Sequence, residues 1–256
     1  MDRQGVLNTF AMPPGMPSYP PGPYRFVSRE FFIVTFRSDP VALSALVPEP
    51  LTLPKDPLAK FEVIRMPDSQ GFGSYTESGI VIPVEYQGRP GGFCAFMFLD
   101  DDPPIAAGRE IWGFPKKYAH PSLSVVKETL TGHLHYGDTL VATSTMAYKY
   151  HPLDPAVVEA SMTGDNYNLK IIPSVSGGHD VVQLVRYRLQ DLKVHWAYQS
   201  PAALEFFAHA MAPLARVPVR EVLYGTHLLS DLTLPYGEVV VDYLADAKAR
   251  PGPTTA

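Results

Sequence analysis

The segment FFIVTF at residues 31–36 combines aromatic and β-branched side chains, a composition typical of a β-strand. Segments of similar composition recur along the rest of the chain. We predict further strands over residues 59–66, 79–86, 92–99, 123–130, 132–136, 140–148, 169–172, 181–189, 193–198 and 221–229. The tetrapeptide YGDT at residues 136–139 predicts a hairpin turn between two of them. Many short strands and few helices indicate a largely antiparallel sheet that is curled or closed into a barrel.

Short helices are predicted where a proline follows a residue that can cap a helix N-terminus. The pairs are Asp39-Pro40, Asp154-Pro155 and Ser200-Pro201. Pro48 and Gly164 would end the first two helices. The predicted fold class is therefore mainly β (α+β), with an antiparallel sheet curled into a β-barrel-like core and a few short helices outside.

The chain shows no linker-like stretch and no internal repeat, so we predict one folded unit. An irregular N-terminal arm rich in proline and glycine is expected at residues 1–22, a single domain at 23–246 and a flexible tail at 247–256. We expect the arm to lie across the surface or across a neighbouring subunit.

Composition narrows the class of protein. Of 256 residues, 46% are hydrophobic and 18% are charged, as in an ordinary globular chain. The net charge of -5 gives no electrostatic case for nucleic acid or an anionic membrane as a partner. The N-terminus lacks an apolar signal segment, and no apolar run approaches the roughly 20 residues of a membrane span, so we expect a cytoplasmic protein. The single cysteine, Cys94, excludes an internal disulfide and is expected in the core.

Two adjacent lysines end the segment GREIWGFPKK at residues 108–117, behind an apolar and aromatic run. A lysine head normally reaches water, but one held in an apolar pocket or beside another cation loses proton affinity. The neutral amine can attack a ketone and form a Schiff base. With an unperturbed pKa of about 10.4, a lysine is neutral about once in 2500 molecules at pH 7, and a pKa lower by roughly three to four units would remove most of that penalty. The pair alone fits an exposed loop equally well.

Several further blocks, in the same order along the chain, resemble the acetoacetate decarboxylase family together with this segment. They are GPY at 22–24, RE at 29–30, FE at 61–62, YTESG at 75–79, LKIIP at 169–173 and HAMAPL at 209–214, so that the resemblance runs from about residue 20 to about residue 243. It implies a Schiff-base enzyme that converts acetoacetate to acetone and carbon dioxide without a metal or organic cofactor. It also implies a large homo-oligomer, a dodecamer in the family. This family is itself a standard example of a lysine activated by its surroundings.

The resemblance assigns the two lysines different roles. Lys116 would be the Schiff-base nucleophile, and Lys117 would be the neighbour whose charge could depress its pKa. Consecutive residues of an extended segment point to opposite sides, so Lys117 could face away from the pocket. Desolvation by Trp112 and Phe114 would then be the larger cause of the lowered pKa, and we favour that cause.

The resemblance also implies an acidic and an apolar part of the site. Glu62 and Glu77 would orient the substrate or relay protons. We expect Arg29 to hold these glutamates rather than the substrate carboxylate, because that charge migrates away in the transition state. The predicted apolar wall of the substrate pocket comprises Phe26, Met97 and Phe114. Phe114 stands where the family often has tyrosine, which removes a hydroxyl and puts a role for a phenol in doubt.

Other chemistries find little support in the sequence. His133 and His135 fall on one face of a predicted strand, but no third ligand has supporting spacing, so we predict no metal site. No glycine-rich phosphate loop and no serine nucleophile elbow is present. Arg109 and Glu110 could form a structural ion pair near the site. The alternative functions are a Schiff-base aldolase or dehydratase of keto acids on the same fold, and a β-barrel that only binds a small ligand.

Overall fold

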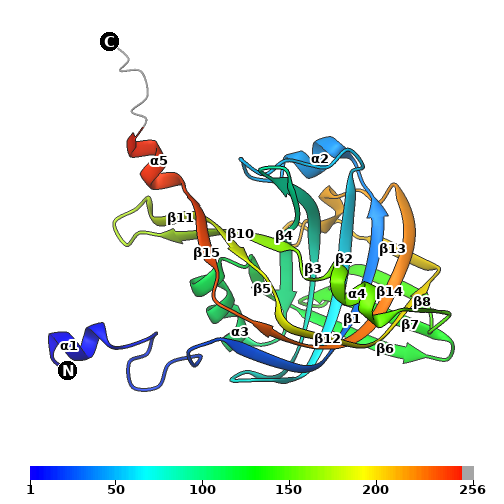
Figure 1. Cartoon of the computed structure of the whole chain (residues 1–256), viewed down its shortest axis with the longest axis horizontal. Coiled ribbons are helices and arrows are strands. Elements are labelled where there is room, and N and C mark those ends of the chain that lie inside the picture. Colours follow the sequence, from blue (N-terminus) through cyan, green and yellow to red (C-terminus); the bar gives the residue numbers. More distant parts are fainter. Residues whose placement is uncertain (250–256) are drawn as a thin grey trace, which may run out of the picture.

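The computed structural model describes residues 1–249 and consists mainly of β-strands (Figure 1). The strands are β1 (Tyr24–Arg37), β2 (Leu58–Ser69), β3 (Gly73–Tyr86), β4 (Arg89–Leu99), β5 (Lys116–Tyr118), β6 (His120–Val126), β7 (Thr129–Tyr136), β8 (Thr139–Ala147), β9 (His151–Leu153), β10 (Asp165–Pro173), β11 (His179–Tyr187), β12 (Gln190–Ser200), β13 (Ala202–Phe206), β14 (Glu221–Leu234) and β15 (Glu238–Asp242). The helices are α1 (Arg3–Leu7), α2 (Pro40–Ser44), α3 (Asp102–Ala107), the π-helix η1 (Gly108–Trp112), α4 (Pro155–Ser161), the 3-10 helix η2 (Leu214–Arg216) and α5 (Tyr243–Ala249).

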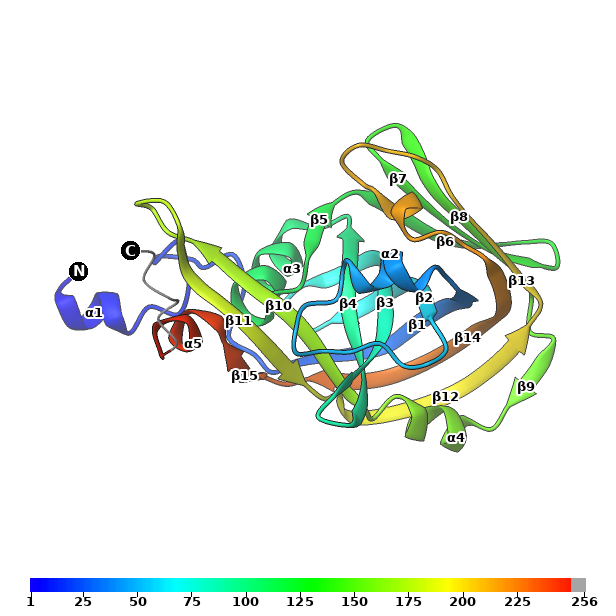
Figure 2. The same ribbon diagram turned by 90° about the horizontal axis from the view of Figure 1, so that it is seen from above.

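An 11-stranded sheet forms the body of the molecule and curves strongly (Figure 2). Its strands follow the order β15-β11-β10-β4-β3-β2-β1-β14-β12-β9, and β5 adds to β4. Only the pairings of β4 with β10 and with β5 are parallel. The ends of the sheet, β15 and β9, do not pair with each other, so the sheet is curled but not closed. The predicted mainly-β class is confirmed, and a closed barrel is not formed.

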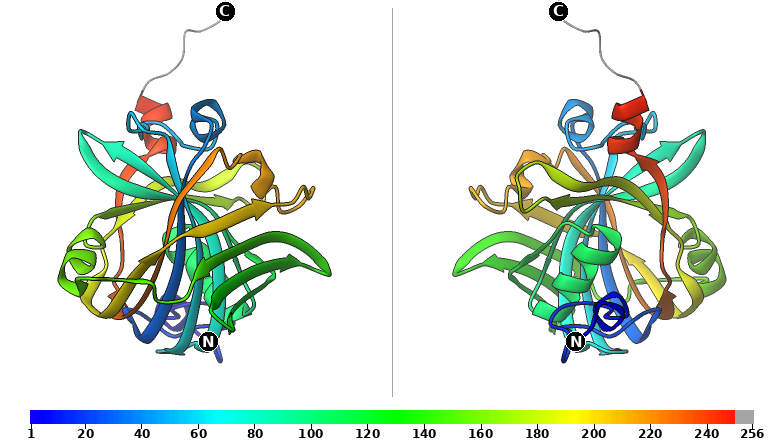
Figure 3. Two further views of the ribbon diagram at one scale, coloured as in Figure 1. Left: turned by 90° about the vertical axis from the view of Figure 1, so that its right-hand side faces the viewer. Right: turned by 90° about the vertical axis from the view of Figure 1, so that its left-hand side faces the viewer.

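A 4-stranded sheet of β13, β8, β7 and β6 lies against the outer side of the larger sheet (Figure 3). The segment at residues 31–36 shows why both sides of β1 are apolar. Phe32 and Val34 point outward and pack with Leu130 and Met146 of the smaller sheet. The alternate residues point inward, as the two-residue repeat of a strand requires. The central strand is therefore buried on both faces, which its continuous apolar run reflects.

Two short helices form where the sequence predicts them. Asp39 caps α2 by accepting hydrogen bonds from the backbone N–H groups of Val41 and Ala42, and Asp154 caps α4 by accepting from Ala156. The predicted helix at Ser200-Pro201 is wrong. That segment continues as β13, which pairs with β8, and its alternating exposure shows that sheet pairing outweighs the N-cap signal there.

One predicted strand is two. Residues 123–130 turn at Lys127, whose φ of 53° separates β6 from β7. The hairpin turn at residues 136–139 is confirmed between β7 and β8. The sequence did not predict α3 and η1, which precede the two lysines.

The first and last helices, α1 and α5, lie toward the same end of the molecule (Figures 1 and 2). The arm predicted at residues 1–22 contains α1, and the tail predicted at 247–256 falls outside the described residues from 250 onward. No helix among residues 1–249 is long and apolar enough to cross a membrane.

Candidate active site

The large sheet curves around a cavity of about 600 Å³. Every second residue of its central strands lines this cavity. On β1 these residues are Phe31, Ile33 and Thr35, and on β2 they are Lys60, Glu62 and Ile64. Of the residues predicted for the site, all but Lys117 line the cavity: Phe26, Arg29, Glu62, Glu77, Met97, Phe114 and Lys116.

Lys116 enters the cavity from β5, where it pairs with Met97 of β4. It is 7% exposed. Its Nζ lies 3.1 Å from Oε2 of Glu77 and 5.2 Å from the ring centre of Phe114. The Lys116 side chain runs directly over Gly108, where a Cβ atom would lie 2.6 Å from its Cδ. Only glycine at position 108 leaves room for the lysine in this conformation.

The segment before Lys116 is fixed by a π-helix and a tight turn. π-Helical turns are rare and occur frequently at functional sites. η1 ends at Gly113, whose φ of 77° is left-handed and whose Cβ would lie 2.4 Å from the Cα of Lys170. Arg109 donates from Nη1 to the carbonyl oxygen of Lys116 at 3.2 Å, and Trp112 donates to the carbonyl oxygen of Pro235 at 2.9 Å. These contacts hold the backbone that carries the amine.

Arg109 and Glu110, which could have formed an ion pair, do not pair with each other in the described part of the chain. Arg109 turns toward the Lys116 carbonyl instead, and Glu110 accepts a hydrogen bond from the hydroxyl of Tyr19. Both residues therefore anchor the segment, each to a different partner.

Glu77 lies between two cations of the cavity, Arg29 and Lys116. Its Oε1 is 3.8 Å from Nη2 of Arg29, and its Oε2 faces Lys116. The contact with Lys116 is close but lacks hydrogen-bond direction, so Oε2 of this buried carboxylate has no hydrogen-bond partner. Nε of Arg29 is also buried without a partner, and the guanidinium lies between the rings of Phe26 and Phe31. Buried polar atoms without protein partners are available to a ligand.

Glu62 makes no ion pair or hydrogen bond with another side chain of the described residues, although it lines the cavity. Burial raises the pKa of its carboxyl, and the charge of Glu77 raises that pKa further, while Lys60 and Arg29 act in the opposite direction. Of the two carboxyl groups, Glu62 has the surroundings that favour the protonated, proton-donating form.

Lys117 points to the opposite side of β5. Its Nζ donates to the carbonyl oxygen of Met211 at 2.5 Å and lies 5.0 Å from the ring centre of Tyr136. The sequence-based expectation that the two lysines face opposite ways agrees with this geometry. Cys94 is buried, as expected, and also lines the cavity, where burial raises the pKa of its thiol and keeps it protonated.

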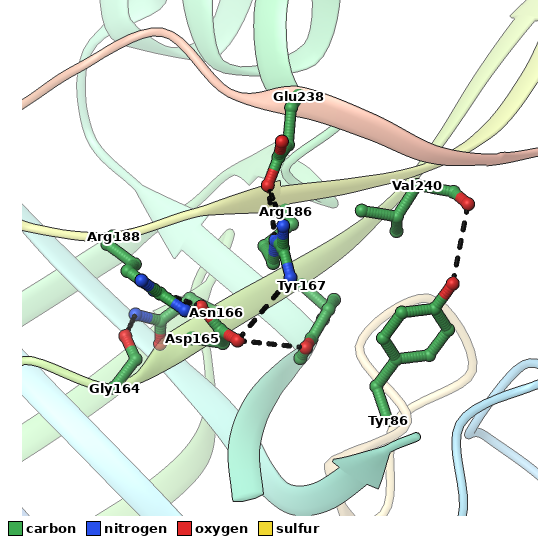
Figure 4. A network of polar contacts seen from close by, with 9 residues as sticks. All are labelled: Tyr86, Gly164, Asp165, Asn166, Tyr167, Arg186, Arg188, Glu238 and Val240. Carbon is green, nitrogen blue, oxygen red and sulfur yellow. Dashed lines mark hydrogen bonds and ion pairs between the residues drawn. The ribbon is translucent and has the colours of Figure 1, made fainter. Parts of the chain in front are cut away.

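One wall of the cavity is held by a polar network on β10, β11 and β15 (Figure 4). Asp165 accepts a hydrogen bond from Nε of Arg188 and lies 3.8 Å from Arg186, which also pairs with Glu238. The Arg188 hydrogen bond is the main reason that the pKa of Asp165 is lowered. The network fixes the parallel junction at which Asp165 pairs with Gly91 of β4.

No group of three or more His, Cys, Asp or Glu side chains is arranged to hold a metal ion within residues 1–249. The rings of His133 and His135 lie 6.2 Å apart on β7, away from the residues that line the cavity.

The comparison with known families now adds to this geometry. The sequence model of one family, described as acetoacetate decarboxylase, matches residues 9–244. The chain belongs to the acetoacetate decarboxylase family.

Relatives named for this family match nearly the whole chain. The acetoacetate decarboxylase of Paraburkholderia xenovorans is 54% identical over 251 residues, which are 98% of this chain and 99% of the relative. The crystal structure of acetoacetate decarboxylase from Legionella pneumophila has 48% identity and a TM-score of 0.88, and the match covers 93% of this chain and 96% of that one. Another acetoacetate decarboxylase structure has 43% identity and a TM-score of 0.92, with coverage of 95% and 100%.

Beside the residues that the family resemblance suggested, three tyrosines line the cavity: Tyr75, Tyr187 and the more exposed Tyr224. Tyr75 belongs to the block at residues 75–79, so its position was visible in the sequence, but nothing marked its side chain as functional. Tyr187 lies at the end of β11, and no sequence signal connects it with Lys116. Only the folded sheet brings it next to Phe114, where the two ring centres are 5.3 Å apart.

Proposed function

We propose that this protein is a carboxy-lyase that converts acetoacetate to acetone and carbon dioxide through a Schiff base on Lys116. The observation that carries the proposal is the amine of Lys116, buried in a largely apolar cavity against a carboxylate, in a chain of the acetoacetate decarboxylase family. A buried amine is expected to have a chemical role, because a lysine head is otherwise more stable in water.

The first half of the proposed reaction forms an imine. The Lys116 nitrogen attacks the keto carbon, and the electrons of the carbonyl double bond move to oxygen. Glu77, 3.1 Å from Nζ, accepts the proton that nitrogen loses and returns it to that oxygen, giving a neutral carbinolamine. Glu62 then donates a proton to the hydroxyl, water leaves, and the nitrogen lone pair closes the protonated imine.

The second half breaks the carbon–carbon bond. The protonated imine lies β to the carboxylate, so carbon dioxide leaves while the bonding electrons move to nitrogen and form an enamine. The enamine carbon takes a proton that derives from solvent, which gives the protonated imine of acetone. Water adds to this imine and releases acetone and the neutral lysine, and the proton set free returns to Glu62. The imine itself is the electron sink, so this route needs no metal or organic cofactor.

In this proposal Arg29 holds the Glu77 carboxylate in place and does not bind the substrate. Its guanidinium is 3.8 Å from Glu77 and is fixed between two phenyl rings, which keeps the carboxylate next to Lys116. A tight ion pair between Arg29 and the substrate carboxylate would stabilise the ground state more than the transition state, from which that charge is departing. Phe26, Met97 and Phe114 surround the reacting atoms with apolar surface.

Borohydride trapping in the presence of acetoacetate, followed by peptide mass mapping, tests the proposal. In the wild-type protein we expect carbon dioxide release and a reduced isopropyl adduct on Lys116. In a Lys116→Arg variant we expect neither the adduct nor carbon dioxide release. An adduct on Lys117 would contradict the assignment of the nucleophile. Carbon dioxide release without any adduct would contradict the imine mechanism.

A protein that yields neither adduct nor carbon dioxide would contradict decarboxylation of acetoacetate itself. Incubation with pyruvate and an aldehyde would then test for the aldolase alternative. From the family, we also propose that the protein is cytoplasmic and forms a homo-oligomer. Light scattering of the purified protein measures the number of subunits.

A further inference from the structure

Three tyrosines line the cavity, and one of them, Tyr224, is 36% exposed. The proposed mechanism leaves without a role the two less exposed phenols, Tyr75 and Tyr187. Neither hydroxyl forms a hydrogen bond with another group of residues 1–249. Buried hydroxyls normally have a partner, so a hydroxyl that lines a cavity without one is suited to a ligand atom.

Tyr187 lies among the groups that carry the reaction. Its ring packs edge-on against Phe114, with ring centres 5.3 Å apart, and the Phe114 ring centre is 5.2 Å from Nζ of Lys116. It lines the same cavity as the three charged side chains Arg29, Glu62 and Glu77. Burial raises its pKa well above the ordinary value, so the group keeps its proton and can only be a donor or a neutral acceptor.

Tyr75 has a different orientation. Nζ of Lys116 lies over its ring, 5.9 Å from the ring centre. Its hydroxyl lies in the plane of the ring, so it does not point at an amine that lies over the ring face. Tyr75 contacts the nucleophile with its ring face and does not offer it a donor.

The attack of Lys116 on a ketone places new negative charge on the keto oxygen. A donor aimed at that oxygen strengthens its hydrogen bond as the charge develops and so stabilises the transition state more than the substrate. We propose that the Tyr187 hydroxyl is a catalytic residue that donates a hydrogen bond to the keto oxygen and then to the hydroxyl of the carbinolamine on Lys116. This role rests on the proposed function.

The proposed hydrogen bond leaves the atoms and electrons of the reaction unchanged. The carbon–nitrogen bond forms from the amine lone pair, the carbonyl electrons move to oxygen, and Glu77 transfers the amine proton to that oxygen. Tyr187 keeps its own proton throughout. Glu62 protonates the hydroxyl, which leaves as water.

A Tyr187→Phe variant tests the inference, because it removes one oxygen and keeps the ring that packs on Phe114. We expect kcat/KM for acetoacetate and the single-turnover rate of borohydride-trapped adduct to fall about a hundredfold, as for the loss of one donor to a developing oxyanion. The KM should change less than threefold, since the hydrogen bond strengthens only as the reaction proceeds. The melting temperature should stay within about 2 °C of the wild-type value, because little packing changes.

Tyr86→Phe is the matched control, since the Tyr86 hydroxyl donates to the carbonyl oxygen of Val240 at 3.4 Å, outside the cavity. It should leave the trapping rate unchanged. A second variant, Phe114→Tyr in the Tyr187→Phe background, returns a phenol to the same ring pair. Its trapping rate should be at least tenfold higher than that of Tyr187→Phe alone.

Trapping rates of Tyr187→Phe within twofold of wild type, with carbon dioxide release intact, would overturn the role of Tyr187 and leave the decarboxylase proposal standing. A wild-type protein that forms no adduct would overturn both.

Discussion

Replacing Gly108 with alanine should move the nucleophile without disturbing the fold. A Cβ at this position would lie 2.6 Å from Cδ, 2.8 Å from Cε and 3.2 Å from Nζ of Lys116. Ordinary carbon–carbon contacts are about 3.5–4.0 Å, so the lysine side chain must shift by roughly 1 Å. The atoms that clash belong to a flexible side chain, so the lysine yields rather than the backbone.

The expected effect on catalysis follows from this displacement. A misplacement of about 1 Å can lower a rate about a hundredfold, which corresponds to about 2.7 kcal/mol of lost transition-state stabilisation. Stability should change little, because alanine in place of a helical glycine stabilises by about 0.5–1 kcal/mol and offsets part of the strain. The variant should therefore be folded and slow.

Steady-state kinetics, the rate of borohydride trapping and thermal unfolding measure these effects. Gly15→Ala is the control, because a Cβ there meets nothing within 4 Å. We expect Gly108→Ala to lose about a hundredfold in trapping rate while Gly15→Ala keeps the wild-type rate. Full activity in Gly108→Ala would refute the claim that this glycine sets the position of Lys116.

Three further predictions concern charged side chains. Glu62→Gln should lower kcat about a hundredfold by removing a proton donor. Burial raises the pKa of Glu62, so the folded protein binds more protons than the unfolded chain between the unfolded pKa of about 4.3 and the raised folded pKa. The wild-type protein therefore loses stability as the pH rises through that window. In urea unfolding, Glu62→Gln should be more stable than wild type at pH 8 but not at pH 3. Asp165→Asn should lower the free energy of unfolding by about 2 kcal/mol at pH 7. Because Arg188 lowers the pKa of Asp165, the difference in unfolding free energy between wild type and variant should be present above about pH 4. It should vanish as the pH falls through the pKa of Asp165 in the folded protein. Urea titrations at a series of pH values measure this difference. Lys117→Gln should change kcat/KM less than about tenfold and leave the pH–rate profile in place, whereas a profile displaced by about one pH unit would show that its charge acts on Lys116.

The sequence predicts the strands of this fold well where a single strand carries a continuous apolar run. Residues 31–36 and 92–99 lie within β1 and β4. Prediction fails where a local signal competes with sheet pairing. Ser200-Pro201 has the chemistry of a helix start, but residues 202–206 pair with β8 and become a strand. Closure of the sheet could not be predicted, because it depends on whether the end strands meet, and β15 and β9 do not.

For the site, the sequence suggests residues through family blocks, and all of these but Lys117 line one cavity. What it does not reveal are contacts between distant segments. How β2, β3 and β11 face one another places Oε2 of Glu77 beside Lys116 and brings Tyr187 next to Phe114. It also leaves Glu62 without an ion pair or side-chain hydrogen bond among the described residues. The need for glycine at position 108 is likewise invisible until the lysine side chain is seen to cross it.

The pair of lysines shows why neighbours in sequence can have unrelated roles. A three-residue strand, β5, carries both, and the two-residue repeat of a strand sends their side chains to opposite faces. Lys116 meets Glu77 and aromatic rings inside the cavity, while Lys117 binds the carbonyl of Met211 on the other side. The groups recorded next to the Lys116 amine are therefore Glu77 and the aromatic walls of the cavity. If Lys116 is the nucleophile, as proposed, we expect the conformation of the strand to influence its environment more than the charge of the adjacent lysine.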